Sequence, residues 1–151
     1  AANTGIAAIL GILIYFYPSE KNILSLMMAA TFASATADTL SSELGNICGS
    51  KFYNIITLQK DGRGLNGVIS LEGILIGLGG SVIIAIIYAF GFGWSAANIL
   101  LITLAGAAGN IGDSIIGATA ERKLLLKNNA VNFLSTGIAA ITALLLHMLY
   151  R

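Results

Sequence analysis

Five long apolar stretches dominate this chain, and most of its acidic and amide residues gather at matching ends of these stretches. A membrane-spanning helix needs about 20 mainly apolar residues. We therefore expect helices over residues 3–17, 22–47, 66–90, 95–121 and 129–150. The predicted fold class is all-α, a polytopic transmembrane bundle with about five spans that forms a single domain over residues 1–151. The sequence leaves open whether one or more further helices precede Ala1.

Composition agrees with a membrane protein. Hydrophobic residues make up 56% of the chain and charged residues only 10%, whereas a soluble globular domain carries roughly 25% charged residues. The net charge is +1 and the chain has no basic run with interleaved aromatic residues, so we discount nucleic-acid binding. The single cysteine excludes an internal disulfide.

Loop charge predicts how the helices are oriented. The connections 49–65 and 121–128 must share one side of the membrane, and together they hold Lys51, Lys60, Arg63, Arg122, Lys123 and Lys127. The opposite side holds only Lys21 and Arg151. The positive-inside rule therefore places the two basic loops in the cytoplasm. Aromatic residues such as Tyr17 and Trp94 lie at the other ends and resemble an outer interface belt.

Two of the expected helices carry polar stripes near the basic side. One stripe consists of Thr31, Ser34, Asp38, Ser41 and Gly45, and the other of Asn110, Asp113, Ser114 and Gly117. An acid inside a membrane segment is costly and is a candidate site residue by default. Two carboxylates at one depth repel each other unless a cation or proton neutralises them. Because oxygen ligands suit Mg²⁺, we expect Asp38 and Asp113 to bind this ion. The alternative is that the two acids form a structural hydrogen-bonded pair between helices.

Glu43 does not fit the first stripe. It lies five residues after Asp38, which places it well off the stripe on a straight helix. Either the helix unwinds near Ser41 and Ser42 or Glu43 serves another contact, and the sequence leaves both readings open.

The connection before the third apolar stretch has the features of an anion-binding site. It reads Gly62-Arg63-Gly64-Leu65-Asn66-Gly67, and Ser70 and Glu72 follow. Free amides and the helix dipole attract phosphate at a helix start, and Lys60 and Arg63 can add charge-assisted bonds. A turn without function is the simpler reading of these glycines, and an acid such as Glu72 suits a helix start in any case. Asn128, Asn129 and Asn132 open the last stretch, where a single asparagine would be enough for a cap.

Four blocks of the chain, taken in order, resemble a known membrane family. They are ADTLSSELG at 37–45, GLNGVIS at 64–70, GDSIIGAT at 112–119 and NAVNFLS at 129–135. In combination they are similar to the family of transmembrane protein 19 and the plant phytyl-phosphate kinase, also described as domain of unknown function 92. The resemblance covers nearly the whole chain.

The resemblance implies a membrane kinase. Such an enzyme transfers a phosphoryl group from a nucleoside triphosphate, with CTP favoured, to an isoprenoid monophosphate of the phytyl or geranylgeranyl type. It implies Mg²⁺ as cofactor, membrane lipids and nucleotide as partners, a possible homo-oligomer, and a place in a prokaryotic cell membrane or a plastid envelope. We expect Asp38, Asp113 and Glu43 to be catalytic, Asp38, Asp113 and Glu72 to hold metal, and Asn66, Gly67, Ser70, Asn110, Asn132, Lys60 and Arg63 to bind phosphate.

Two other classes of function stay open. An ion-coupled transporter or lipid carrier also has intramembrane acids and glycine-broken helices, but it predicts acids near the membrane centre and a polar path to both sides. A non-catalytic assembly subunit needs only the glycine seams of the third and fourth stretches. Because the acids cluster at one side, the kinase is the preferred hypothesis.

Overall fold

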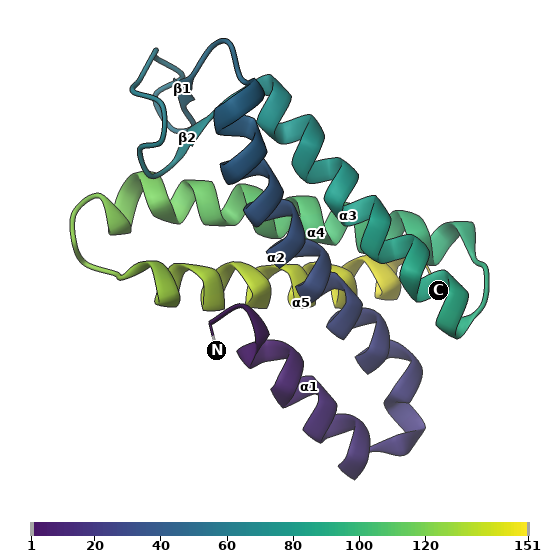
Figure 1. Cartoon of the computed structure of the whole chain (residues 1–151). Helices are drawn as coiled ribbons and strands as arrows, with labels where there is room; N and C mark the ends of the chain where they lie inside the picture. The colour runs from purple at the N-terminus through teal and green to yellow at the C-terminus, as the bar shows by residue number, and fades with distance from the viewer. Residues whose placement is uncertain (1, 151) are drawn as a thin grey trace.

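Most of the chain is helical in the computed structural model, which describes residues 2–150 (Figure 1). The α-helices are α1 (Gly5–Phe16), α2 (Lys21–Cys48), α3 (Leu71–Phe92), α4 (Ala96–Ile116) and α5 (Asn128–Tyr150). Short 3-10 turns at Ala2–Thr4 and Pro18–Glu20 precede α1 and α2, and a π-helical turn at Gly117–Glu121 extends α4. Strands β1 (Tyr53–Asn54) and β2 (Val68–Ile69) pair antiparallel in the α2–α3 loop. Arg151, one of the two basic residues expected on the far side, lies outside the described residues.

The predicted all-α membrane bundle is confirmed. Four segments are long and apolar enough to cross a membrane, namely Pro18–Cys48, Leu71–Phe92, Ala96–Glu121 and Asn128–Tyr150. The first expected span is shorter, because α1 has only 12 residues. At 1.5 Å per residue it extends about 18 Å, which is less than the roughly 30 Å of a bilayer's hydrocarbon core.

The third helix begins later than the sequence suggested, at Leu71 instead of Asn66. The Ser70 hydroxyl caps the helix by accepting a hydrogen bond from the Gly73 N–H at 3.0 Å. Before it, Gly67 has a φ of +70°, a left-handed conformation that ends any continuous helix. Residues 66–69 are therefore free to form part of a cavity wall.

Helix α2 is the centre of the bundle and contacts all four other α-helices, as its diagonal course in Figure 1 indicates. The side chains at these contacts are small. Ala30, Ala33 and Ala37 on α2, Ala105 on α4 and Ala139 on α5 are all fully buried. Small side chains allow helix backbones to approach closely, so polar residues on different helices can come within reach of one another.

The two basic loops meet at one end of the bundle. Arg122 Nη1 lies 2.8 Å from Asp61 Oδ2, so the α2–α3 loop contacts the turn that follows α4. The ends of α2 and α4 and the beginnings of α3 and α5 consequently lie at this end. The assignment of this end to the cytoplasm stays a prediction.

Candidate functional site

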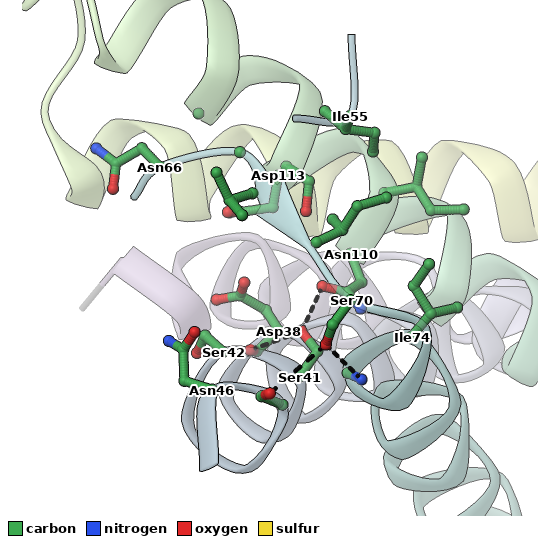
Figure 2. Close-up of a pocket in the computed structure, with 18 of the residues that line it drawn as sticks. Asp38, Ser41, Ser42, Asn46, Ile55, Asn66, Ser70, Ile74, Asn110 and Asp113 are labelled. Atoms are coloured by element: carbon green, nitrogen blue, oxygen red, sulfur yellow. Dashed lines mark hydrogen bonds between the residues drawn. The ribbon is translucent and has the colours of Figure 1, made fainter. Parts of the chain in front are cut away.

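A cavity of about 300 Å³ opens at the end of the bundle where the basic loops meet. Helices α2 to α5 and the α2–α3 loop all contribute to its wall (Figure 2). Its polar lining includes Asp38, Ser41, Ser42, Asn46, Asn66, Ser70, Asn110, Asp113, Ser114, Glu121, Asn128 and Asn132. The cavity therefore collects polar groups that are far apart in the sequence.

Asp38 and Asp113 lie on neighbouring helices, α2 and α4, and both line this cavity (Figure 2). Each side chain is only partly accessible to solvent. The π-helical turn after α4 brings a third carboxyl group, that of Glu121, to the same wall. The expectation that Asp38 and Asp113 lie at one depth agrees with this placement, while their role in binding metal stays a prediction.

Among the described residues, two oxygen atoms in the cavity wall have no hydrogen-bond partner. Asp113 Oδ2 and Asn132 Oδ1 are buried without a hydrogen bond to any residue in the range 2–150. A buried acceptor left unpaired costs roughly 1–3 kcal/mol, and more when it is charged. A bound cation, or a ligand that carries hydrogen-bond donors, would remove this cost.

The ligand atoms suit Mg²⁺. The polar lining offers carboxylate, amide and hydroxyl oxygens, the hard donors that this ion prefers. Within residues 2–150 no group of three or more His, Cys, Asp or Glu side chains is placed to hold a metal alone. Mg²⁺ commonly uses only one or two carboxylates and completes its shell with water and substrate phosphates. Asp38 and Asp113 fit that pattern.

Asn110 is held in place by its neighbours. The Ser41 hydroxyl donates a hydrogen bond to Asn110 Oδ1 at 3.1 Å, linking α2 to α4 beside the two acids. On α3, Gly77 makes room for the amide, because a Cβ at Gly77 would lie 2.8 Å from Asn110 Nδ2. With its oxygen engaged by Ser41, the Asn110 amide has its NH₂ group to offer to an anionic ligand.

Arg122 fixes the loop that forms the upper wall, although the sequence argument had used it only as a loop charge. Its Nε donates to the backbone oxygen of Asn66 at 2.5 Å, and its Nη1 lies 2.8 Å from Asp61. The Gly62 N–H and the Arg122 guanidinium hold the pKa of the Asp61 carboxyl below its usual value of 3.8. At Gly67 the loop backbone packs directly on Ala118, leaving no space for a side chain.

We expect the Arg122→Gln variant to loosen this wall without unfolding the bundle. An exposed ion pair stabilises only weakly, so amide exchange over residues 52–70 should quicken only a few-fold. Because the pKa of Asp61 is lowered, the pair contributes fully above pH 3.8 and is lost only as the solution becomes more acidic than that value. Hydrogen–deuterium exchange measures both effects.

Lys123→Gln is the matched control for Arg122→Gln, since Lys123 is an exposed neighbour with the same charge. Its exchange profile should match that of the unmodified protein. Equal exchange in the two variants would show that the contacts of Arg122 do not hold the loop.

The structure brings together seven of the predicted site residues. They are Asp38, Asn66, Gly67, Ser70, Asn110, Asp113 and Asn132, and all line the cavity. Four others lie outside its lining. Glu43, Lys60 and Arg63 are exposed, and Glu72 Oε1 instead accepts hydrogen bonds from the Ser50 backbone N–H at 3.2 Å and the Ser50 hydroxyl at 2.7 Å. The proposed roles of these four residues remain predictions.

The structure excludes one of the two readings that the sequence left for Glu43. Helix α2 is continuous through Ser41 and Ser42 to Cys48, so it does not unwind to bring Glu43 onto the stripe. Asn46 and Glu121 were missed, yet each lies eight residues after one of the paired acids, Asp38 and Asp113. Asn46 lies one residue after Gly45 and Glu121 four residues after Gly117, so continuing each stripe by about one turn would have reached both.

Comparisons with known proteins agree with the membrane fold. The sequence model of the family described as integral membrane protein DUF92 matches residues 1–140. The chain is 36% identical over 118 residues to an uncharacterized membrane protein of Methanocaldococcus jannaschii, covering 78% of this chain and 49% of that protein. It is 34% identical over 141 residues to an uncharacterized membrane protein of Synechocystis sp., covering 91% of this chain and 54% of that protein.

A plant protein is also similar. The chain is 32% identical over 129 residues to the chloroplastic protein VTE6 of Arabidopsis thaliana, covering 83% of this chain and 39% of VTE6. The chain thus spans about half the length, or less, of these relatives. No solved structure matches it.

Proposed function

This chain belongs to the DUF92 family of integral membrane proteins, and we propose that it carries the site of a membrane kinase. The reaction is transfer of a phosphoryl group from a nucleoside triphosphate to an isoprenoid monophosphate, which gives the diphosphate. One observation carries this proposal: a single cavity contains three carboxyl groups, several amide groups and an apolar wall at one end of a membrane bundle. An anionic headgroup attached to a lipid tail is the kind of substrate that such a cavity fits.

Phosphoryl transfer needs positioning and charge stabilisation more than covalent participation of the protein. An oxygen of the isoprenoid phosphate attacks the γ-phosphorus of the nucleotide, and the bond from that phosphorus to the β–γ bridging oxygen breaks. The nucleoside diphosphate leaves with the electron pair of that bond. Because the attacking phosphate is already ionised, the reaction needs no general base, and none is assigned.

In this proposal the residues around the cavity have different roles. Asp38 and Asp113 would hold Mg²⁺, which when bound neutralises phosphate charge. Asn110 and Asn132 line the cavity, and their amides would donate hydrogen bonds to phosphate oxygens. Donors fixed before the reaction stabilise developing charge most effectively. The wall formed by Asn66, Gly67 and Ser70 would enclose the other side of the phosphates.

The basic loops above the cavity would attract the nucleotide. Lys60, Arg63 and Arg122 lie in these loops, and a concentration of positive charge at a cleft raises the local concentration of an anion and its rate of association. With the loops in the cytoplasm, the site has direct access to nucleoside triphosphates. CTP is the favoured donor.

The test uses the full-length protein purified in detergent. We expect geranylgeranyl or phytyl phosphate to be converted to the diphosphate when Mg²⁺ and one of the four common nucleoside triphosphates are present, and conversion to stop on addition of EDTA. Uptake of the lipid phosphate or of an ion by sealed vesicles, without diphosphate formation, would support the transporter reading instead. Absence of product with every nucleotide would contradict the kinase proposal.

A further inference from the structure

The cavity is divided into a polar and an apolar side. Figure 2 shows Asp38, Ser42 and Asn46 toward one side, and Ile55 and Ile74 toward the other. The apolar lining also includes Leu78 on α3, together with Ala107 and Ile111 on α4. A cavity divided in this way fits a ligand that carries an anionic head and an apolar tail.

Besides its opening at the loop end, the cavity reaches the surface of the bundle on its apolar side. Ile74, Leu78 and Ile111 line the cavity and are nevertheless 40%, 38% and 46% exposed. On a membrane-spanning segment, exposed aliphatic side chains of this kind face lipid. All three belong to helices long and apolar enough to span the membrane, so on this side the cavity faces the bilayer.

The apolar lining also extends toward the middle of the membrane. Ile74 and Leu78 follow the start of α3 at Leu71, so they lie about 4.5 and 10.5 Å below the loop end at 1.5 Å per residue. On α4, which runs toward the loops, Ile111 and Ala107 lie about 3 and 9 Å deeper than Asp113. The apolar wall therefore descends from the level of the acids toward the middle of the bilayer.

The size of the cavity gives an independent reason for an exit. Its volume of about 300 Å³ is at the lower end of the range found for sites that enclose a drug-sized ligand. Phosphate groups must occupy the polar side. A lipid tail of many carbons then has no room within the cavity and must leave through the wall.

We propose that the tail of the lipid phosphate passes sideways between α3 and α4, over Ile74, Leu78 and Ile111, so that the substrate enters directly from the bilayer. This inference rests on the proposed function, because it assumes an isoprenoid phosphate as the ligand. Only the carbons nearest the phosphate contact protein, and the rest of the tail lies among membrane lipids. Substrates whose tails differ only beyond those first carbons should consequently have similar kcat/KM values.

A bulky side chain in the opening should obstruct the tail. We expect Leu78→Trp to raise the KM for geranylgeranyl phosphate at least ten-fold more than the KM for the five-carbon dimethylallyl phosphate. Leu75→Trp is the matched control, since Leu75 is 58% exposed on the same helix but does not line the cavity. Leu75→Trp should leave the KM for both substrates unchanged. Equal KM values for Leu78→Trp and Leu75→Trp would overturn the proposal.

A labelling experiment tests the same exit without relying on catalysis. Geranylgeranyl phosphate with a diazirine in its second isoprene unit is photolysed with the full-length protein in lipid nanodiscs, without nucleotide. Adducts should fall on Ile74, Leu78 or Ile111, and adducts confined to α1 or α5 would overturn the proposal. Labelling at these three residues without diphosphate formation would refute the kinase but support the lipid site, whereas product formation with labelling elsewhere would do the reverse.

Discussion

The Asp38→Asn and Asp113→Asn variants should each lose roughly 10²- to 10³-fold in kcat/KM for diphosphate formation, the scale seen when one preorganised electrostatic group is removed. Both carboxylates line one cavity, and Oδ2 of Asp113 is buried there without a partner among residues 2–150. The amide has nearly the same shape as the carboxylate but carries no charge, so it binds Mg²⁺ poorly. Product formation by the purified variants, followed over time at saturating nucleotide, gives the measurement.

The same two variants should fold at least as well as the unmodified protein. Two like charges in a partly buried cavity repel each other, and removal of either charge relieves that repulsion. In the absence of Mg²⁺ the melting temperature should therefore stay the same or rise by a few degrees. Added Mg²⁺ should raise the melting temperature of the unmodified protein, because a ligand that binds only the folded state stabilises it, and it should have little effect on either variant.

Glu20→Gln is the control for a lost carboxylate. Glu20 is exposed in the turn before α2, at the end of that helix opposite the cavity. This variant should keep both the activity and the response to Mg²⁺. If Asp38→Asn and Asp113→Asn behaved like Glu20→Gln in both assays, the two acids would not form the proposed metal site.

The convergence of Asp38 and Asp113 was predictable because helices are regular. A fixed rise and rotation per residue place a polar stripe on one face and at one depth, and loop charge showed which helix ends belong together. The same regularity explains why Glu43 lies outside the cavity. Five residues after Asp38 on an uninterrupted helix, it faces away from the stripe, as the exposed position of Glu43 shows.

The α2–α3 loop was not predictable in the same way, because contacts distant in sequence determine its shape. The Arg122 guanidinium reaches the backbone of Asn66 across 56 residues of sequence, and β1 pairs with β2 across the whole loop. No local pattern encodes either contact. The late start of α3 was recoverable in principle, since Ser70 is a favoured capping residue, but Asn66 and Gly67 offered a competing start signal.

Gly109 is the position where we expect a single substitution to damage the fold most. It lies on α4 between two other helices, and a Cβ there would lie 2.7 Å from Ser34 Cβ on α2 and 2.8 Å from the Ser135 backbone oxygen on α5. Real Cβ atoms do not approach this closely, and a backbone oxygen cannot rotate away. Gly109→Ala should destabilise the bundle by about 1–3 kcal/mol, the usual cost of overpacking, and Gly109→Leu should prevent folding into a monodisperse protein.

Thermal unfolding in detergent measures the effect of Gly109→Ala, and Gly79→Ala provides its control. Gly79 lies within α3, yet a Cβ there meets no heavy atom within 4 Å, so this variant should melt like the unmodified protein.

The Gly109→Ala variant also tests how the two acids of the site are held together. Gly109 lies one turn of α4 from Asp113, so a forced separation of α2 from α4 also separates Asp113 from Asp38. Gly109→Ala should consequently weaken stabilisation by Mg²⁺ as well, and a variant that melted normally would show that the close approach of α2 and α4 does not hold the two acids together.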